Sequence, residues 1–98
     1  MYHDNFTYKN LEFELTCYAC PEQYDVFDLA NNRNQVGYVR LRWGNLRCDY
    51  PDVNGDTIYK FSFAELEDSY YKGCFFCTEE REKYLKEIAE AILERLHG

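Results

Sequence analysis

Two Cys-x-x-Cys pairs are the residues of this sequence best suited to chemistry. They are Cys17 with Cys20, and Cys74 with Cys77. Thiolates three residues apart on a tight turn can bind one ion together, and two such pairs supply the four ligands of a tetrahedral zinc site. Zinc ribbons usually separate their pairs by roughly 15 to 20 residues, whereas here most of the chain lies between them. Zinc bound by these four cysteines is therefore one hypothesis.

Two other interpretations of the cysteines stay open. Cys17 fits the inward face of a strand as a small apolar residue, and the second pair can pack around the start of a helix. A helix N-terminus also lowers the pKa of a thiol, which suits Cys74 and Cys77 for redox chemistry, but the βαβ context of thioredoxin-like proteins is missing. The odd total of five cysteines argues against a disulfide framework and agrees with reduced thiols in a cytoplasmic protein.

An arginine-rich stretch stands out from an otherwise acidic chain. The net charge is −7, yet residues 29–48 hold four arginines and no acidic residue, which leaves −11 on the remainder. This balance repels nucleic acid over long range and favours basic partners, while a local patch could still hold an anion or an acidic protein. The candidate anion-binding or partner-binding residues are Tyr38, Arg40, Arg42 and Arg47.

A strand predicted over residues 35–43 would present these side chains together. Period-two alternation puts the tyrosine and the first two arginines on one face. The other face, which we expect to point inward, carries Val39, Leu41 and Trp43. Arginine forks beside an aromatic ring can bind phosphate, a flipped base or a carboxylate-rich partner. Alternatively, the arginines pair across the sheet with acidic residues. Those acidic residues would be Glu12, Glu14 or Asp25.

The elements that must position these residues are several strands followed by one helix. Alternation and β-forming residues predict strands over 11–18, 23–29, 35–43, 46–50 and 57–63, and short turns make successive strands neighbours. From Thr78 onward, apolar residues at helical spacing predict a helix that lies across one face of the sheet. The members of that apolar stripe are Leu85, Ile88, Ala89, Ile92 and Leu96.

The predicted fold class is therefore α+β, with an antiparallel β-meander of about five strands packed against one C-terminal amphipathic helix. We expect a single domain over residues 1–98, with residues 1–9 as a candidate flexible N-terminal segment. Residues 64–73 are expected to form a loop or one helical turn. Monomer and homodimer both stay open.

Other patterns for catalysis or ligand binding are weak. The two histidines, His3 and His97, stand at the ends of the chain, and the five glycines are isolated, so neither a nucleophilic site nor a phosphate loop is expected. Acidic and Asn residues over 49–56 could chelate calcium, but they lack EF-hand spacing and are ordinary turn formers. No apolar run is long enough to cross a bilayer, and the first residues lack the features of a signal peptide. We expect no enzyme and no membrane association.

Four stretches carry a resemblance to other proteins. They are PEQYDVFD at 21–28, QVGYVRLR at 35–42, DYPD at 49–52 and EREKYL at 80–85. Together they look like a group of small uncharacterised proteins from bacterial phages and mobile elements. That group has no established activity to transfer, so function must be argued from the residues.

The resemblance implies a role, because small acidic proteins of that origin often bind and block a host enzyme. We therefore expect a non-enzymatic protein-binding module, a phage-encoded inhibitor or modulator of a host nucleic-acid-handling or defence protein. It would act through its acidic helix face or its aromatic-rich sheet face. The alternative is a zinc-stabilised small domain that binds nucleic acid or a nucleotide through the arginine and aromatic residues of the sheet.

Overall fold

The described part of the chain folds into one antiparallel sheet with one long helix on it. The computed structural model describes residues 5–17, 22–63 and 78–98. The strands follow the chain in the order β1-β2-β3-β4-β5-β6, so the predicted meander is confirmed. Their bounds are Phe6–Tyr8 (β1), Leu11–Cys17 (β2), Glu22–Asp28 (β3), Asn34–Arg42 (β4), Asn45–Tyr50 (β5) and Asp56–Ser62 (β6), and helix α2 spans Thr78–His97.

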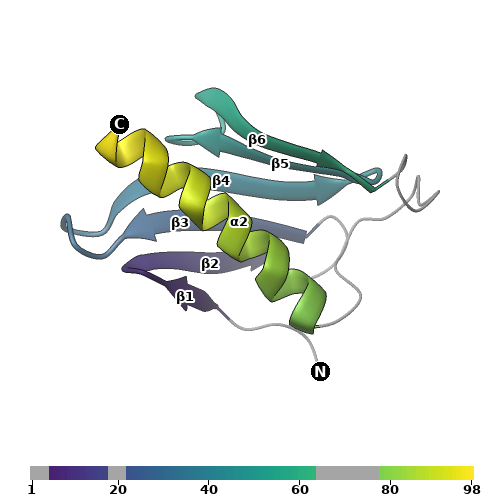
Figure 1. Ribbon diagram of the computed structural model, residues 1–98, viewed down its shortest axis with the longest axis horizontal. Helices are drawn as coiled ribbons and strands as arrows, with labels where there is room; N and C mark the ends of the chain where they lie inside the picture. The colour runs from purple at the N-terminus through teal and green to yellow at the C-terminus, as the bar shows by residue number, and fades with distance from the viewer. Residues whose placement is uncertain (1–4, 18–21, 64–77) are drawn as a thin grey trace.

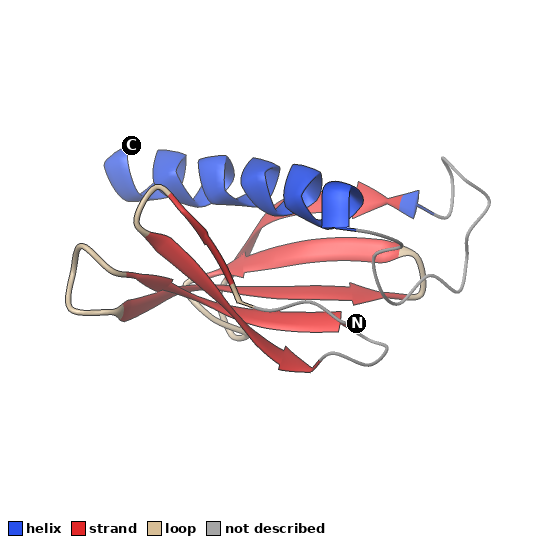
Figure 2. Cartoon of the chain, turned by 90° about the horizontal axis from the view of Figure 1, so that it is seen from below, coloured by secondary structure: helices blue, strands red, loops and turns tan. Residues whose placement is uncertain are grey.

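Helix α2 divides the sheet into a covered and an open face. The helix crosses the strands diagonally on one side (Figure 1). Seen at 90° to that view, it forms a layer of its own, and no described element covers the opposite side of the sheet (Figure 2). We call that side the open face. The described helix is not long and apolar enough to span a membrane.

The core lies between the sheet and the apolar stripe of α2. Leu85, Ile88, Ala89 and Ile92 are completely buried, as the helical spacing predicted. The sheet residues that meet them alternate along the strands and include Phe13, Tyr24, Val26, Val39, Leu41 and Leu46. Helix and sheet approach closely at Gly37 on β4, where a Cβ atom would lie 3.0 Å from the Cδ1 atom of Ile92. The α+β class and the position of the helix are therefore confirmed.

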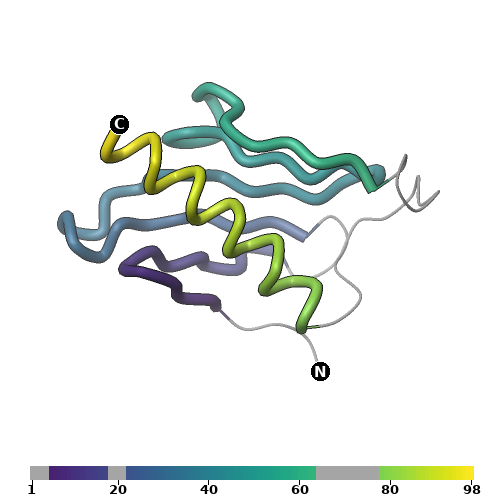
Figure 3. Tube along the Cα trace, in the orientation of Figure 1, coloured from purple at the N-terminus to yellow at the C-terminus, as the bar shows by residue number. Residues whose placement is uncertain are grey.

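A short sixth strand precedes the five that were expected. Residues 6–8 lie within the segment predicted to be flexible, but they form β1 at one edge of the sheet, opposite the β6 edge (Figure 3). The turn between β1 and β2 uses Lys9 and Asn10 with φ of 49° and 68°. The Tyr8 hydroxyl and the Lys9 Nζ each donate to Glu90 Oε2 over 2.8 Å. These bonds to α2, together with the ladder to β2, order a segment that is too short to show alternation.

The prediction that Trp43 points inward is wrong. Val39 and Leu41 are buried, but 57% of the Trp43 surface is exposed. β4 ends at Arg42, and Trp43 and Gly44 form a two-residue turn to β5 with φ of 54° and 75°. Positive φ at both positions is typical of the tight turns that join hairpin strands. The left-handed backbone ends the alternation one residue early and turns the indole out of the core.

Candidate anion-binding site

Three cationic side chains lie directly opposite one another on the open face. Arg40 on β4 pairs in register with Arg47 on β5, and Arg47 pairs with Lys60 on β6. Arg40 and Arg47 alternate with buried neighbours, and exposed Lys60 alternates with Tyr59 and Phe61, which pack against the core, so all three point away from α2. Directly opposite side chains on antiparallel strands have Cβ atoms about 4.5–5.5 Å apart. We call Arg40, Arg47 and Lys60 the cationic row.

The cationic row lines a recess at the β4–β5 turn end of the sheet. The recess has a volume of about 620 Å³, which lies within the roughly 300–1,000 Å³ of small-molecule sites. We call it the basic recess. Its lining residues are Arg40, Arg42, Trp43, Asn45, Leu46, Arg47, Thr57, Lys60, Phe61 and Ser62. Four cations, two hydroxyls, an amide and an indole therefore surround one space, a combination suited to an anionic ligand.

One of these cations has an internal counterion. The Arg47 Nε lies 3.4 Å from Asp49 Oδ1, and that buried carboxylate also accepts a 2.7 Å hydrogen bond from the Thr57 hydroxyl. Among the described residues, no carboxylate lies within ion-pair distance of Arg40, Arg42 or Lys60. Most of the charge in the recess is therefore not neutralised by the described part of the chain.

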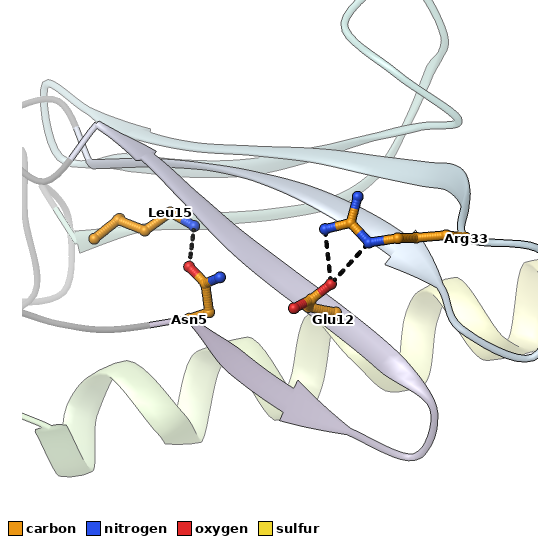
Figure 4. A network of polar contacts seen from close by, with 4 residues as sticks. All are labelled: Asn5, Glu12, Leu15 and Arg33. Carbon is orange, nitrogen blue, oxygen red and sulfur yellow. Dashed lines mark hydrogen bonds and ion pairs between the residues drawn. The ribbon is translucent and has the colours of Figure 1, made fainter.

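Arg33, the arginine of residues 29–48 that lies outside the recess, has a carboxylate partner, whereas Arg40 and Arg42 have none within the described ranges. Arg33 holds Glu12 Oε1 through its Nε at 3.2 Å and its Nη2 at 2.9 Å (Figure 4). Its guanidinium also lies 4.2 Å from the centroid of the Phe27 ring. In the same view the Asn5 side chain accepts a bond from the Leu15 amide, which secures β1 to β2. Arg33 thus has a structural role in the turn between β3 and β4. It can serve as a control for the arginines of the recess, because its charge is already paired with Glu12.

The acidic residues proposed as cross-strand partners lie elsewhere on the open face. Arg40 stands opposite Gln23 and Arg47, and Arg42 stands opposite Asn45. Glu14 on β2 instead faces Asp25 on β3, and burial together with the neighbouring Glu14 charge raises the pKa of Asp25. The open face is therefore divided into an acidic half on β2 and β3 and a basic half on β4 to β6.

The structure brings together three of the four predicted binding residues. Arg40, Arg42 and Arg47 share the basic recess, whereas Tyr38 stands between Asp25 and Asp49 and does not line it. Lys60 and Trp43 also line the recess but were not among the predicted residues. Lys60 could have been found from the β5–β6 pairing, but an irregularity in that ladder between Cys48 and Asp49 changes the register that the turn alone would predict.

The proposed zinc site extends beyond the described residues. Cys17 is the half-buried last residue of β2, and Cys20, Cys74 and Cys77 lie outside the described ranges. Within those ranges no group of three His, Cys, Asp or Glu side chains is placed to hold a metal ion. The zinc and redox hypotheses for these cysteines stay predictions, and elemental analysis of the purified protein would test the first.

The acidic turn proposed for calcium has other partners. Asp49 pairs with Arg47, the Asp52 carboxylate accepts a 2.9 Å bond from the Asn54 amide, and Asp56 Oδ2 lies 3.1 Å from Arg95 Nη2. These are the ion pairs and turn contacts that carboxylates commonly make. The arrangement accounts for the residues without a metal ion.

A buried polar network ties the first turns of α2 to β3. The Tyr24 hydroxyl donates to Glu22 Oε2 and accepts a 2.7 Å bond from Arg81 Nε, and all three residues are buried. Burial, followed by the adjacent Glu22 carboxylate, raises the pKa of Tyr24. A phenol that resists ionisation is a poor nucleophile. The network instead stabilises the packing of the start of α2 against β3 through buried hydrogen bonds. The alternating pattern of β3 did not predict it.

No protein-family model, curated protein or solved structure matched the chain.

Proposed function

We propose that this protein is a non-enzymatic binding module whose basic recess takes up an acidic segment of a protein partner. The cationic row carries this proposal, because Arg40, Arg47 and Lys60 stand in adjacent register positions on three strands. Arginine forks bind carboxylates through two parallel hydrogen bonds, which adds geometric specificity to the charge.

The energetic argument starts from the repulsion within the row. Like charges directly opposite on neighbouring strands destabilise a sheet. An exposed sheet face needs no cation at these positions to fold, and acidic residues are plentiful in this chain, with 18 Asp and Glu against 11 Lys and Arg. A feature that lowers folding stability is typical of a site that serves binding, since functional sites often trade stability for activity.

The acidic and basic halves of the open face would also orient the bound partner. A partner whose acidic segment enters the basic recess would bring its adjacent surface over β2 and β3, where Glu14 and Asp25 face each other. Complementary potentials speed association and disfavour wrong orientations. We therefore expect the partner to carry a basic surface beside the acidic segment.

The phage resemblance extends the proposal to a biological role. We propose that the partner is a host nucleic-acid-handling or defence protein, which this chain inhibits or modulates. Such proteins carry basic surfaces that contact phosphate backbones, and those surfaces fit the acidic half of the open face. The proposed role depends on the recess only for positioning the partner.

A binding assay with a defined acidic probe tests the proposal. A fluorescein-labelled glutamate-rich peptide should bind the wild-type chain at low salt, and the double variant Arg40→Gln/Lys60→Gln should lose about tenfold or more in affinity, because each lost charge-assisted contact contributes about 1.5–3 kcal/mol in favourable geometry. Arg33→Gln is the matched control, since it removes an arginine that already has a partner in Glu12.

Two outcomes would contradict the proposal. The first is an acidic peptide that does not bind even at low salt. The second is an Arg33→Gln control that weakens binding as much as the recess variants do, because the net charge rather than the recess would then explain the result. Pull-down from a bacterial lysate with wild-type and double-variant baits can then identify the partner that depends on the recess.

A further inference from the structure

The basic recess contains an aromatic platform as well as cations. Trp43 lines it, is 57% exposed, and is the single tryptophan of the chain. Ligand sites are commonly lined by aromatic side chains together with a small number of convergent polar groups. The indole thus adds a second kind of recognition to the recess.

The backbone at Trp43 strengthens this argument. Two-residue turns with positive φ at both positions strongly favour Asn-Gly, and here Trp-Gly occupies them with φ of 54° and 75°. A bulky residue in the left-handed region is an outlier. Strained backbone conformations concentrate at binding and catalytic sites, and the inference runs from the observed outlier to a function. Trp43 is poorly suited to the turn and well placed for the recess.

A cationic row beside an indole matches the two parts of a nucleotide. Arginine and lysine bind phosphate oxygens, and Asn45, Thr57 and Ser62 supply further hydrogen-bonding groups in the same recess. Bases stack on aromatic side chains, and such stacking is tolerant of base identity. An acidic peptide segment would bind the cations but would not need the indole.

The size and charge of the surroundings favour a small ligand over an extended strand. The recess has a volume of about 620 Å³, and the acidic half of the open face begins on β3, the strand next to β4, where Asp25 stands opposite Glu14. A long polyanion crossing the sheet would meet that repulsion and the net charge of −7. A compact nucleotide held in the recess would avoid the acidic half of the open face.

We propose that the basic recess binds a nucleoside di- or triphosphate, with the phosphates on the cationic row and the base against Trp43. This goes beyond the proposed protein binding, because it assigns a small ligand to the same recess and gives Trp43 a role that the acidic segment does not require. Nucleotide and acidic partner would then compete for Arg40, Arg47 and Lys60.

Titration of the intrinsic fluorescence tests the proposal directly, since the chain has one tryptophan. We expect ATP to quench Trp43, whereas tripolyphosphate, which lacks the base, should bind about tenfold more weakly in calorimetry, because stacking of one base changes affinity by about that factor. The Arg40→Gln and Lys60→Gln variants should weaken both ligands alike. Arg33→Gln should weaken neither.

The variant Trp43→Asn separates the base from the phosphates. Asparagine suits the left-handed position in the turn, so the variant should fold, which circular dichroism can verify. We expect it to lose about tenfold in affinity for ATP and little for tripolyphosphate. Equal affinities of the wild type for ATP and tripolyphosphate would overturn the proposal, as would unchanged ATP binding by Trp43→Asn or no ATP binding at millimolar concentration.

A single-stranded oligonucleotide and the acidic peptide complete the experiment. If a long oligothymidine binds more tightly than ATP in proportion to its length, the ligand is a nucleic-acid strand and the nucleotide proposal fails. Acidic-peptide binding should survive in Trp43→Asn, since it depends on the cations alone. A wild-type chain that binds the acidic peptide but not ATP therefore refutes only this inference, and one that binds ATP but not the peptide refutes only the proposed function.

Discussion

Reversing the charge of Lys60 should stabilise the fold while it weakens the basic recess. Lys60 stands opposite Arg47, whose other neighbour in register is Arg40. The substitution Lys60→Glu replaces a repulsive cross-strand contact with an attractive one, and it leaves the buried core on the other face of β6 unchanged. The prediction follows from the register alone.

The expected magnitude follows from the position of the pair on the surface. An opposite-charge cross-strand pair contributes about 0.2–1 kcal/mol, and a like-charge pair destabilises by a similar amount. The Arg47 side chain is 37% exposed and already has Asp49 as a partner. Screening therefore reduces both the repulsion from Lys60 and the attraction to a glutamate at that position. We expect the free energy of unfolding to rise by about 1 kcal/mol, which would raise Tm by about 4–8 °C in a domain of this size.

Urea and thermal unfolding, followed by circular dichroism, would measure this change at low salt and at about 1 M NaCl. The Debye length falls from about 10 Å at 0.1 M to about 3 Å at 1 M, so the gain should shrink in high salt. Lys60→Gln should give about half of it. The same neutralisation at exposed Lys86, which has Glu82 and Glu90 four residues away on α2, should instead destabilise.

Two results would refute this reasoning. Lys60→Glu could destabilise the fold at low salt, which would mean that the lysine has a favourable partner and the row is not repulsive. Alternatively, Lys86→Gln could stabilise the protein as much as Lys60→Gln does. In that case the change in net charge, rather than the contact with Arg47, would be the cause.

Further predictions concern the core and the titrating groups. Gly37→Ala should destabilise by about 1–3 kcal/mol in urea unfolding, because its Cβ would lie 3.0 Å from the Cδ1 atom of Ile92. Tyr24→Phe removes the hydroxyl that links a buried glutamate to a buried arginine, and should lower the free energy of unfolding by about 1–3 kcal/mol. Burial raises the pKa of Cys48 to about 12, so mass spectrometry should find this thiol unalkylated by iodoacetamide at about pH 8 until the protein unfolds. Burial and the facing carboxylate raise the pKa of Asp25, so its ionisation opposes folding as the pH rises; Asp25→Asn should unfold at higher urea concentration than the wild type at neutral pH and lose that advantage in acid.

The sequence by itself determined the elements and the faces that they bury. Val39 and Leu41 alternate into the core, and Leu85, Ile88 and Ile92 form the buried face of α2 as their spacing predicted. These patterns are reliable because the periods of two and 3.6 are local properties of the backbone, and burying one face is the main source of stability. The α+β class followed from those two periods and from short turns.

Only the tertiary structure decided which charged residues meet. Arg40 and Arg47 were identified as candidates, but Lys60 joins them through a register that the β5–β6 irregularity sets. A slip of one residue would move every side chain of a strand to the other face, so register depends on the whole ladder and the core beneath it.

Trp43 shows the same limit at a single residue. Its place in the alternation predicted burial, whereas a left-handed turn exposes it at the basic recess. The backbone angle at that position depends on how β4 and β5 must twist to pair. Alternation therefore identified the cationic face of β4, and the turn geometry, which no periodic pattern contains, placed the indole beside it.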